Sequence, residues 1–337
     1  MPKAAPPRSS AMCWSRPSAN PSPERRRAAC RPGARARRAR GLSLIELMIG
    51  IVIGLVLITF MIRGFAASSG NSAVNSLVSE YQTNGRYAQE TLSREIRHAA
   101  LSPLLWDASQ IEVTPAAAAR NFGCGAGVTT LVRQGLAASN DSNPYSGNCL
   151  AAASDRQYAR GDVLTLRRLG SSTTASFSSN APYARTSYAA GRIFLGGETP
   201  PTPLPPFFDY PALSDVYFIN EFTNSPTESP KVPALYRLTL SAGANPVMVP
   251  ELVASNVEHL QLQFGVVDGS GNVRYFNPDG VTDWTAVTSV RLWLLLRASE
   301  PEAGMTSDSY TMADVTYTPG DRFRRLVLTS TIQVRNR

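Results

Sequence analysis

The chain has 337 residues, of which 43% are hydrophobic, and it carries a formal net charge of +8. Residues 1–41 contain ten arginines and one lysine against a single glutamate, a charge of +10, which leaves about −2 for residues 42–337. The length allows one substantial core. Because the basicity belongs to the N-terminal segment, the rest has no extended cationic surface, and we do not expect nucleic-acid binding.

The N-terminal segment, residues 1–41, is rich in Arg, Pro and Ala. This composition predicts disorder. Met12 is the other methionine before Gly41, and no Leu or Val occurs between Met12 and Leu42. Translation could therefore begin at Met1 or at Met12.

An apolar stretch follows, and its one charged residue is Glu46. Residues 42–62 read LSLIELMIGIVIGLVLITFMI. At about 1.5 Å per residue, a helix of this length spans the roughly 30 Å of bilayer hydrocarbon. Because the arginines precede it directly, they are expected to stay in the cytoplasm while the C-terminal bulk faces outward.

Two ordinary interpretations of this stretch leave Glu46 unexplained. A secretory signal peptide could be cut near Gly64-Phe65-Ala66, but its apolar core is shorter and carries no acidic residue. An uncleaved anchor accounts for the length, yet a carboxylate in hydrocarbon costs about 2.5–3.5 kcal/mol. A third interpretation has to give this glutamate a role.

The segment Gly41-Leu42-Ser43-Leu44-Ile45-Glu46-Leu47 resembles the class III signal of type IV prepilins. The resemblance implies cleavage between Gly41 and Leu42 by a membrane prepilin peptidase, which also N-methylates Leu42. Phe is usual at the first mature position, so Leu42 departs from the family but stays hydrophobic. Glu46 occupies the fifth mature position, where its carboxylate can pair with the new amine of a neighbouring subunit during assembly.

The helix is expected to continue beyond the membrane as an amphipathic half over residues 63–102. Glu90 and Arg94 form an i,i+4 pair, and Pro103 marks the expected end. Apolar residues recur at steps of three, four and seven, which define one helix face: Val74, Leu77, Val78, Tyr81, Ala88, Leu92, Ile96 and Ala99.

Four cysteines divide evenly between the leader and the rest of the chain. Cys13 and Cys30 would leave with residues 1–41, whereas Cys124 and Cys149 close a loop of about 25 residues. In a chain exported to an oxidising compartment this pair predicts a disulfide worth about 3 kcal/mol, with two unpaired buried thiols as the alternative. The loop is rich in Gly, Ser and Asn, and we expect it to lie at the periphery.

Residues 103–337 are predicted to form a β-rich globular head. A stretch rich in Ser, Thr, Gly and Pro, residues 171–206, is expected to be an exposed loop. One long N-terminal helix packed on a largely antiparallel sheet gives an α+β, type IV pilin-like fold. Six runs read as strands: Asp162–Arg167, Asp215–Ile219, Ala234–Leu240, Val257–Val267, Val287–Leu296 and Arg325–Val334.

No catalytic, cofactor or metal constellation is visible in the head. His98 and His259 lack a nearby nucleophile and are expected to be surface or packing residues, and two histidines with two cysteines do not suggest zinc. Gly123–Gly127 lacks the lysine and the flanking elements of a phosphate loop. Asp268–Asn272, with Asp279 nearby, could ligate calcium but indicates first a hairpin turn.

The last third carries a second resemblance. Val216-Tyr217-Phe218-Ile219, Gln261-Leu262-Gln263-Phe264-Gly265, Asp283-Trp284 and the C-terminal arginines are similar to the C-terminal region of PilW-type minor pilins. The J-type minor pseudopilin of type II secretion is the alternative, and an exported enzyme on an ordinary anchor is a rival of another class.

The PilW resemblance implies a structural function without catalysis. We expect a minor subunit of a priming or tip complex that supports assembly of a type IV pilus, and with it adhesion, twitching motility or DNA uptake. The implied partners are the prepilin peptidase, other minor pilins, the major pilin and a PilY-type tip adhesin. The expected location is the inner membrane, with the head in the periplasm, and then the pilus.

Overall fold

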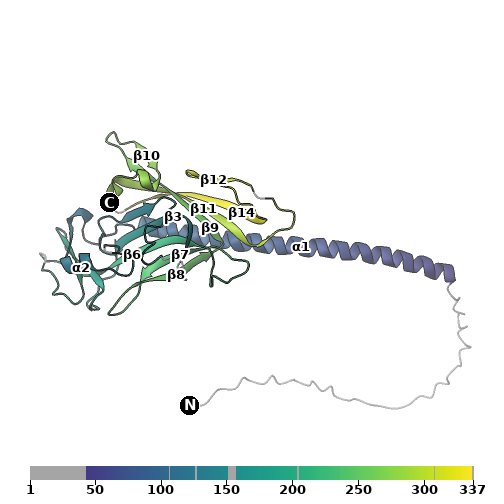
Figure 1. Ribbon diagram of the computed structural model, residues 1–337, viewed down its shortest axis with the longest axis horizontal. Helices are drawn as coiled ribbons and strands as arrows, with labels where there is room; N and C mark the ends of the chain where they lie inside the picture. Colours follow the sequence, from purple (N-terminus) through teal and green to yellow (C-terminus); the bar gives the residue numbers. More distant parts are fainter. Residues whose placement is uncertain are drawn as a thin grey trace, which may run out of the picture. The chain divides into compact units, whose positions relative to one another are not determined.

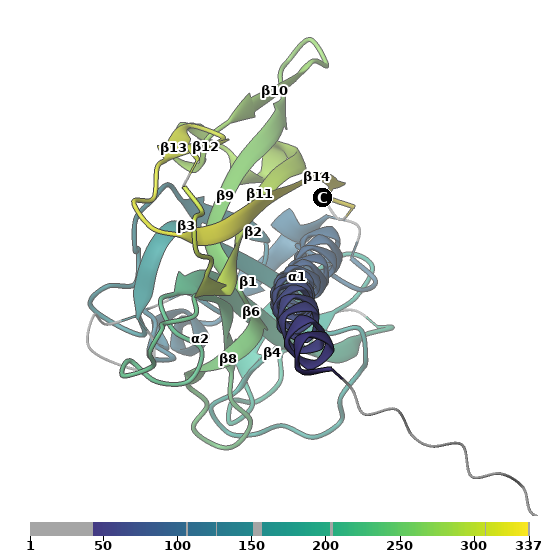
Figure 2. The same cartoon turned by 90° about the vertical axis from the view of Figure 1, so that its right-hand side faces the viewer.

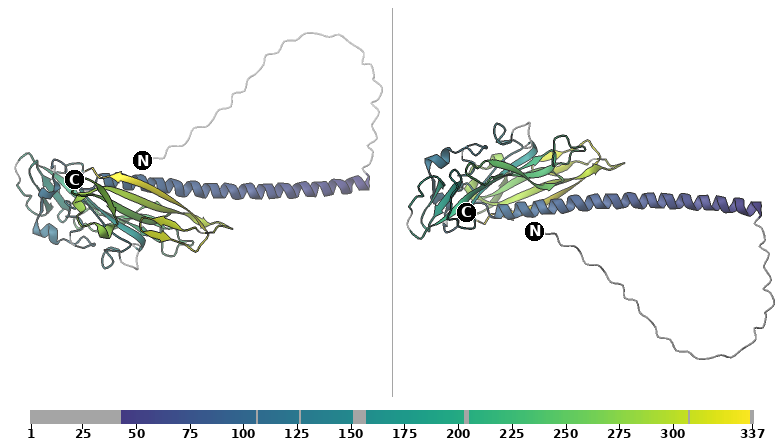
Figure 3. Two further views of the ribbon diagram at one scale, coloured as in Figure 1. Left: turned by 90° about the horizontal axis from the view of Figure 1, so that it is seen from above. Right: turned by 90° about the horizontal axis from the view of Figure 1, so that it is seen from below.

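The computed structural model describes most of the chain from Ser43 onward. The chain forms two units, Met1–Ile62 and Arg63–Arg337, which are described one by one. The helix α1, Leu44–Arg97, contributes its first part to one unit and its second part to the other (Figure 3). The described residues are 43–105, 107–125, 127–150, 157–202, 205–306 and 308–335.

The predicted long helix is confirmed, but it ends five residues before the predicted boundary at residue 102. After Arg97 the chain turns, and Ala100 takes the left-handed conformation with φ 59°. The N–H of Ala100 donates to the carbonyl of Arg167 at 2.9 Å, so the chain leaves the helix by bonding to a strand. This hydrogen bond, rather than Pro103, ends the helix.

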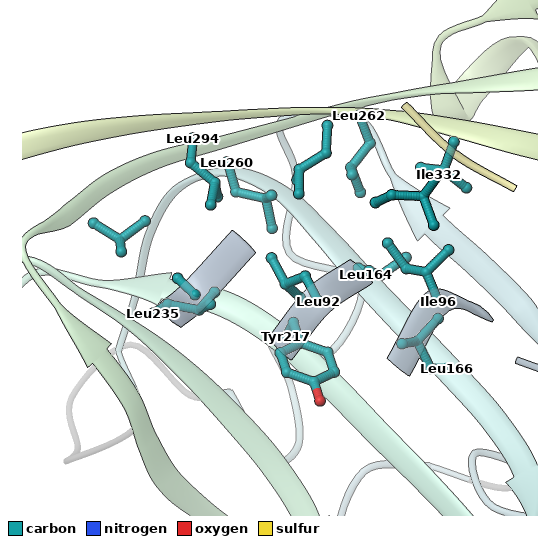
Figure 4. Close-up of a cluster of buried hydrophobic side chains, with 14 of the residues drawn as sticks. Leu92, Ile96, Leu164, Leu166, Tyr217, Leu235, Leu260, Leu262, Leu294 and Ile332 are labelled. Atoms are coloured by element: carbon teal, nitrogen blue, oxygen red, sulfur yellow. The ribbon is translucent and has the colours of Figure 1, made fainter. Parts of the chain in front are cut away.

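Within the second unit, the predicted apolar face of α1 is the buried one. Tyr81, Ala88, Leu92, Ile96 and Ala99 are all at most 3% exposed and belong to one hydrophobic cluster. Figure 4 shows Leu92 and Ile96 between leucines that come from two different sheets. The amphipathic half of the helix is therefore held by packing on both sheets.

All but one of the pairings in the largest sheet are antiparallel; the exception is β1 with β5. The long strand β6 pairs with three neighbours. We call this sheet one. Its path is β1-β5-β4-β6-β3-β2, with β7 on β6 and β8 on β7. The bounds are β1 Ile111–Val113, β2 Leu136–Ser139, β3 Tyr158–Leu169, β4 Pro182–Thr186, β5 Gly191–Leu195, β6 Phe208–Asn220, β7 Ala234–Leu240 and β8 Met248–Ser255.

A second, antiparallel sheet has the order β10-β9-β11-β14 and is called sheet two. Figure 1 shows β9, β11 and β14 running together, and Figure 2 shows them grouped apart from β6 and β8. A small hairpin of β12 and β13 precedes β14 in the chain. The bounds are β9 Val257–Val267, β10 Val273–Phe276, β11 Val287–Pro301, β12 Tyr310–Met312, β13 Val315–Tyr317 and β14 Phe323–Gln333.

Single-turn and short helices fill connections in the head. They are η1 Ala108–Gln110, α2 Pro115–Ala119, η2 Pro278–Gly280 and η3 Trp284–Ala286. Thr114 caps α2, because its side chain accepts the Ala117 N–H and Pro115 occupies the first turn. These short helices lie in the connections between strands. The predicted α+β architecture is confirmed.

All six predicted strands exist. The predicted bounds of β7 and β9 match the structure, whereas β3, β6 and β11 are longer than predicted and β14 begins and ends earlier. The exposed loop predicted over residues 171–206 is wrong in its middle, which forms β4 and β5. These strands bury Ala184, Ile193 and Phe194, but they are five residues long and flanked by Ser, Gly and Pro, so the composition hides their apolar positions.

The two faces of sheet one are buried by different partners. On one face, Leu164, Leu166 and Tyr217 pack in the cluster that contains α1 and sheet two. On the other face, Val216 and Phe218 pack in a second cluster with residues of the segment 105–150. Alternate residues of β6 therefore contribute to two separate cores.

Candidate functional site

The first described part of α1, residues 44–62, is apolar on every side apart from Glu46 and Thr59. Leu44 is 78% exposed, Ile58 53% and Ile62 63%, and an 18-residue window has a mean hydropathy of 2.7 with none of it buried. The helix is long and apolar enough to cross a membrane. Such a surface needs lipid or other apolar helices around it, because water would leave it unstable.

Glu46 folds back on the start of the helix. Its Oε2 accepts the backbone N–H of Ser43 at 3.0 Å, and Ser43 Oγ accepts the N–H of Ile45 at 3.3 Å. This resembles a capping box, in which Ser and a Glu three residues later satisfy the free N–H groups of a helix start. The Ser-x-x-Glu spacing of Ser43 and Glu46 predicts this arrangement. From the sequence, however, Glu46 is assigned only to pairing with the amine of a neighbouring subunit.

Gly41 and Leu42 lie outside the described residues. Cleavage between them, N-methylation of Leu42 and the pairing of Glu46 with a neighbour's amine therefore stay predictions. What the structure adds is that the Glu46 carboxylate can be satisfied within its own chain. A test of its role must separate helix capping from charge pairing.

A row of alternating charges joins the second half of α1 to sheet one. Glu95 on α1 accepts from Arg168 on β3 at 2.6 Å, and Arg168 lies 3.6 Å from Asp215 on β6. Arg237 on β7 lies 3.9 Å from Asp215 and 2.5 Å from Glu251 on β8. Burial raises the pKa of Asp215, although the Arg237 and Arg168 charges lower it. The row links the helix to four neighbouring strands of sheet one.

The predicted disulfide between Cys124 and Cys149 is present, with the Cα atoms 4.7 Å apart. The prediction that its loop is peripheral is wrong. Cys124 is 2% exposed and Cys149 3%, and both belong to the cluster on the second face of sheet one. Apolar residues between and beside the cysteines, including Phe122 and Val128, anchor the loop despite its Gly, Ser and Asn content.

A buried arginine docks the same segment on sheet one. Arg167 Nε donates to the Val128 carbonyl at 2.9 Å, and its Nη1 donates to the Gln134 carbonyl at 3.0 Å. Ser214 Oγ donates to the same Val128 carbonyl at 2.7 Å. Burial lowers the pKa of Arg167. Because carbonyls satisfy this guanidinium, it orders the loop rather than forming an ion pair.

The other candidate residues from the sequence lie at the surface, in packed regions or in turns. His259 is buried with its ring centroid 5.7 Å from that of Tyr317, and His98 is exposed. Asp268 Oδ1 accepts the N–H groups of Ser270 and Asn272, each at 2.9 Å, which confirms a turn between β9 and β10. Among the described residues, no three His, Cys, Asp or Glu side chains form a group that could hold a metal.

The Asp283-Trp284 pair lies at a groove of about 540 Å³ near the end of α1. Ala99, Leu136 and Val334 also line this groove. The Trp284 ring stands edge-on to Phe264 at a centroid distance of 4.9 Å, so it belongs partly to the core of sheet two. The tryptophan therefore has a packing role.

Two family profiles match the chain. A family described as Type IV Pilus-assembly protein W covers residues 216–336, and the Prokaryotic N-terminal methylation motif covers residues 36–62. The two matches make the chain similar to PilW-type type IV pilins over its last third and over its N-terminal motif. A type IV-like pilin from Thermus thermophilus is similar in structure at 14% identity and a TM-score of 0.27, over 52% of this chain and 78% of that one. No curated protein matches.

The two matched regions lie in different parts of the chain. The methylation motif contains Glu46 and the apolar helix, while the PilW region contains β7 to β14 and part of β6. The two matches support a role in type IV pilus assembly, and the motif implies interaction with other pilins and with a prepilin peptidase. The family is structural and non-enzymatic.

Proposed function

We propose that the protein is a minor pilin that joins the priming or tip complex of a type IV pilus. The observation that carries the proposal is the pairing, in one chain, of a prepilin methylation motif with a PilW region. The exposed apolar helix supplies the surface that neighbouring pilin helices would cover. Adhesion, twitching motility or DNA uptake would follow from assembly.

The proposed topology puts the head in the periplasm and then on the cell surface. Residues 1–41 would be the leader, 42–62 the membrane span, 63–102 the amphipathic segment and 103–337 the head. Proposed partners are the major pilin, other minor pilins and a PilY-type tip adhesin. Deleting the gene should remove surface pili and leave type II secretion intact. Loss of secretion with pili intact would favour the J-type pseudopilin.

Processing is the first step of the proposal. We expect cleavage between Gly41 and Leu42, with N-methyl-leucine as the first residue in mass spectrometry of the mature protein. A bulky residue at Gly41 should block processing, whereas Gly41→Ala is expected to be partly tolerated. A mature chain that starts at Ala67, or an intact leader in cells with active peptidase, would refute the assignment.

Glu46 gives the sharpest test of assembly. Glu46→Ala should leave cleavage and membrane insertion unharmed, because it removes a charge that is costly in lipid. We expect the processed protein to be lost from sheared filaments and from co-purification with partner pilins, because its carboxylate no longer pairs with a neighbour's amine.

The control is Glu46→Gln, which can still accept the Ser43 N–H but carries no charge. If charge pairing drives assembly, the glutamine variant fails as the alanine variant does. Normal incorporation of the glutamine variant beside a defective alanine variant would assign Glu46 to helix capping. Normal incorporation of both would show the carboxylate to be dispensable.

A further inference from the structure

The outer strand of sheet two, β14, has a free edge. It pairs with β11 on one side, and just beyond this pairing the N–H of Val334 donates to the carbonyl of Thr288 at 2.9 Å. In an antiparallel ladder, residues bonded to the neighbouring strand alternate with residues whose N–H and C=O groups point away from it. The register therefore turns the backbone groups of Val327, Thr329 and Thr331 to the free edge. Among the described residues, none of these three N–H groups has a hydrogen-bond partner.

This edge lacks the protection that long edge strands usually carry. Charged side chains, proline or a covering segment normally prevent an edge from pairing with another chain. The strand β8 of sheet one is protected in this way, because it contains Pro250 and Glu251 and its Met248 N–H donates to the Phe122 carbonyl at 2.8 Å. In β14 the run Leu326–Gln333 contains no charged residue and no proline. The strand β14 therefore presents a backbone that another strand can pair with.

The second part of α1 runs beside this edge, and both lead to the groove near the end of the helix. Gln89 Nε2 on α1 donates to the Thr329 carbonyl at 3.2 Å, and Figure 2 shows β14 next to α1. Ala99, Val334 and Trp284 line the groove of about 540 Å³. A strand added to β14 would thus lie along α1 and place a side chain in the groove.

The groove has an excess of negative charge. Asp107 and Asp283 line it, against the single guanidinium of Arg133. Hydrogen bonds from Ser109 and Thr285 lower the pKa of the Asp107 and Asp283 carboxyls, respectively, so both are ionised at neutral pH. Neither carboxylate forms an ion pair with a residue that the structure describes. The groove therefore fits an apolar side chain with a basic one beside it.

We propose that a β-strand of a neighbouring pilus subunit adds to β14 as a fifth strand of sheet two. Its backbone would bond to the outward groups of Val327, Thr329 and Thr331, and Gln89 would release the Thr329 carbonyl. In strand addition, main-chain hydrogen bonds supply affinity and side-chain pockets supply specificity. The fitting segment is uncharged along Leu326–Gln333 and ends in an apolar residue followed by Lys or Arg. The inference rests on the proposed function, because the partner is another subunit of the pilus.

Amide hydrogen exchange of the wild-type protein tests the pairing directly. The full chain in detergent is compared with the same chain in sheared filaments, with exchange resolved to single amides by mass spectrometry. The amides of Val327, Thr329 and Thr331 should exchange fast in the isolated chain and about tenfold or more slower in filaments. The amides of Leu328 and Ser330, which face β11, should be protected in both states and serve as the reference.

Proline at the edge blocks the pairing without breaking the existing ladder. Thr331→Pro removes one outward N–H, which edge strands tolerate. It should be processed and should unfold at the wild-type midpoint, but its recovery in sheared filaments should fall about fivefold or more. Thr331→Val keeps the N–H and should be recovered as wild type. Thr329→Lys is a second blocking variant that needs no backbone change, and it should also lower recovery because a charge protects an edge strand.

The charge of the groove is tested by a variant that preserves its turn. Asp283→Asn can still cap the turn, since asparagine also accepts the N–H groups, but it carries no charge. Its recovery in filaments should fall by a smaller factor than that of Thr331→Pro. The matched control is Asp268→Asn, which makes the same change in the turn between β9 and β10 and should leave recovery unchanged.

The outcomes separate this inference from the proposed function. Wild-type protein recovered in filaments with unprotected edge amides would overturn the inference alone. Recovery of both Thr331→Pro and Thr329→Lys at the wild-type level would do the same. Full recovery of Asp283→Asn would overturn the placement of the added strand's basic residue at the groove. Absence of the wild-type chain from filaments would overturn the proposed function and this inference together.

Discussion

At Gly85, α1 packs closely against Leu296 of sheet two. A Cβ at this position would lie 2.1 Å from Cδ1 of Leu296, which is fully buried on β11. Gly85→Ala therefore has to displace a packed leucine or the helix, and we expect it to lower the free energy of unfolding by about 1–3 kcal/mol. Chemical denaturation of the full chain in detergent would measure the change.

Gly70→Ala is the control, because a Cβ at Gly70 meets nothing within 4 Å. It should be neutral or stabilising by up to about 1 kcal/mol, since alanine favours helix over glycine. The double variant Gly85→Ala/Leu296→Ala should lose less than the sum of the two single changes. Strict additivity of the two would show that the contact does not limit helix packing.

At the scale of elements, the charge row predicts a pH effect. Burial raises the pKa of Asp215, so the folded head binds a proton more tightly there than the unfolded chain. Its contribution to stability is complete below about pH 4, the unfolded pKa, and is lost as the pH rises through the folded pKa. Asp215→Asn should flatten the decline of the unfolding midpoint above that pH, and an unchanged slope would contradict the assignment.

The disulfide segment should be more important to stability than its composition suggests. Replacing Cys124 and Cys149 together by alanine should cost about 3 kcal/mol from the loop of 25 residues, with a further loss from the buried sulfur contacts. Denaturation of wild type and of the variant, each with and without reductant, would measure this. Reductant should affect wild type alone, and a loss well under 1 kcal/mol would restore the view of a peripheral loop.

At the scale of the whole molecule, the two halves should be separable. Neither hydrophobic cluster contains a residue before Val78. A chain that begins at Arg63 should therefore fold and stay in solution without detergent, with the unfolding midpoint of the full chain. Sedimentation and thermal denaturation would test this, and aggregation or a lower midpoint would show that residues 44–62 support the head.

The sequence by itself determined the features that depend on neighbouring residues. The apolar span, the helix face from Tyr81 to Ala99, the cysteine pair and the bounds of β7 and β9 follow from composition and from periods of 3.6 or 2. The prepilin motif also follows from the sequence, through the family resemblance. It can be recognised there because its glycine, the following hydrophobic residue and Glu46 stand at fixed spacing within one short segment.

Tertiary structure decided what depends on packing between distant segments. Three features depend on strand order and register. Strands β4 and β5 join sheet one, the Cys124–Cys149 segment covers the second face of that sheet, and Arg168 and Asp215 lie next to each other beside α1. The hydrogen bonds of Asp141 to Asp162 and of Asn140 to Asp314 have the same origin. A periodic pattern in the sequence does not show which face of a sheet a loop covers, because the buried contacts join residues that are far apart in sequence.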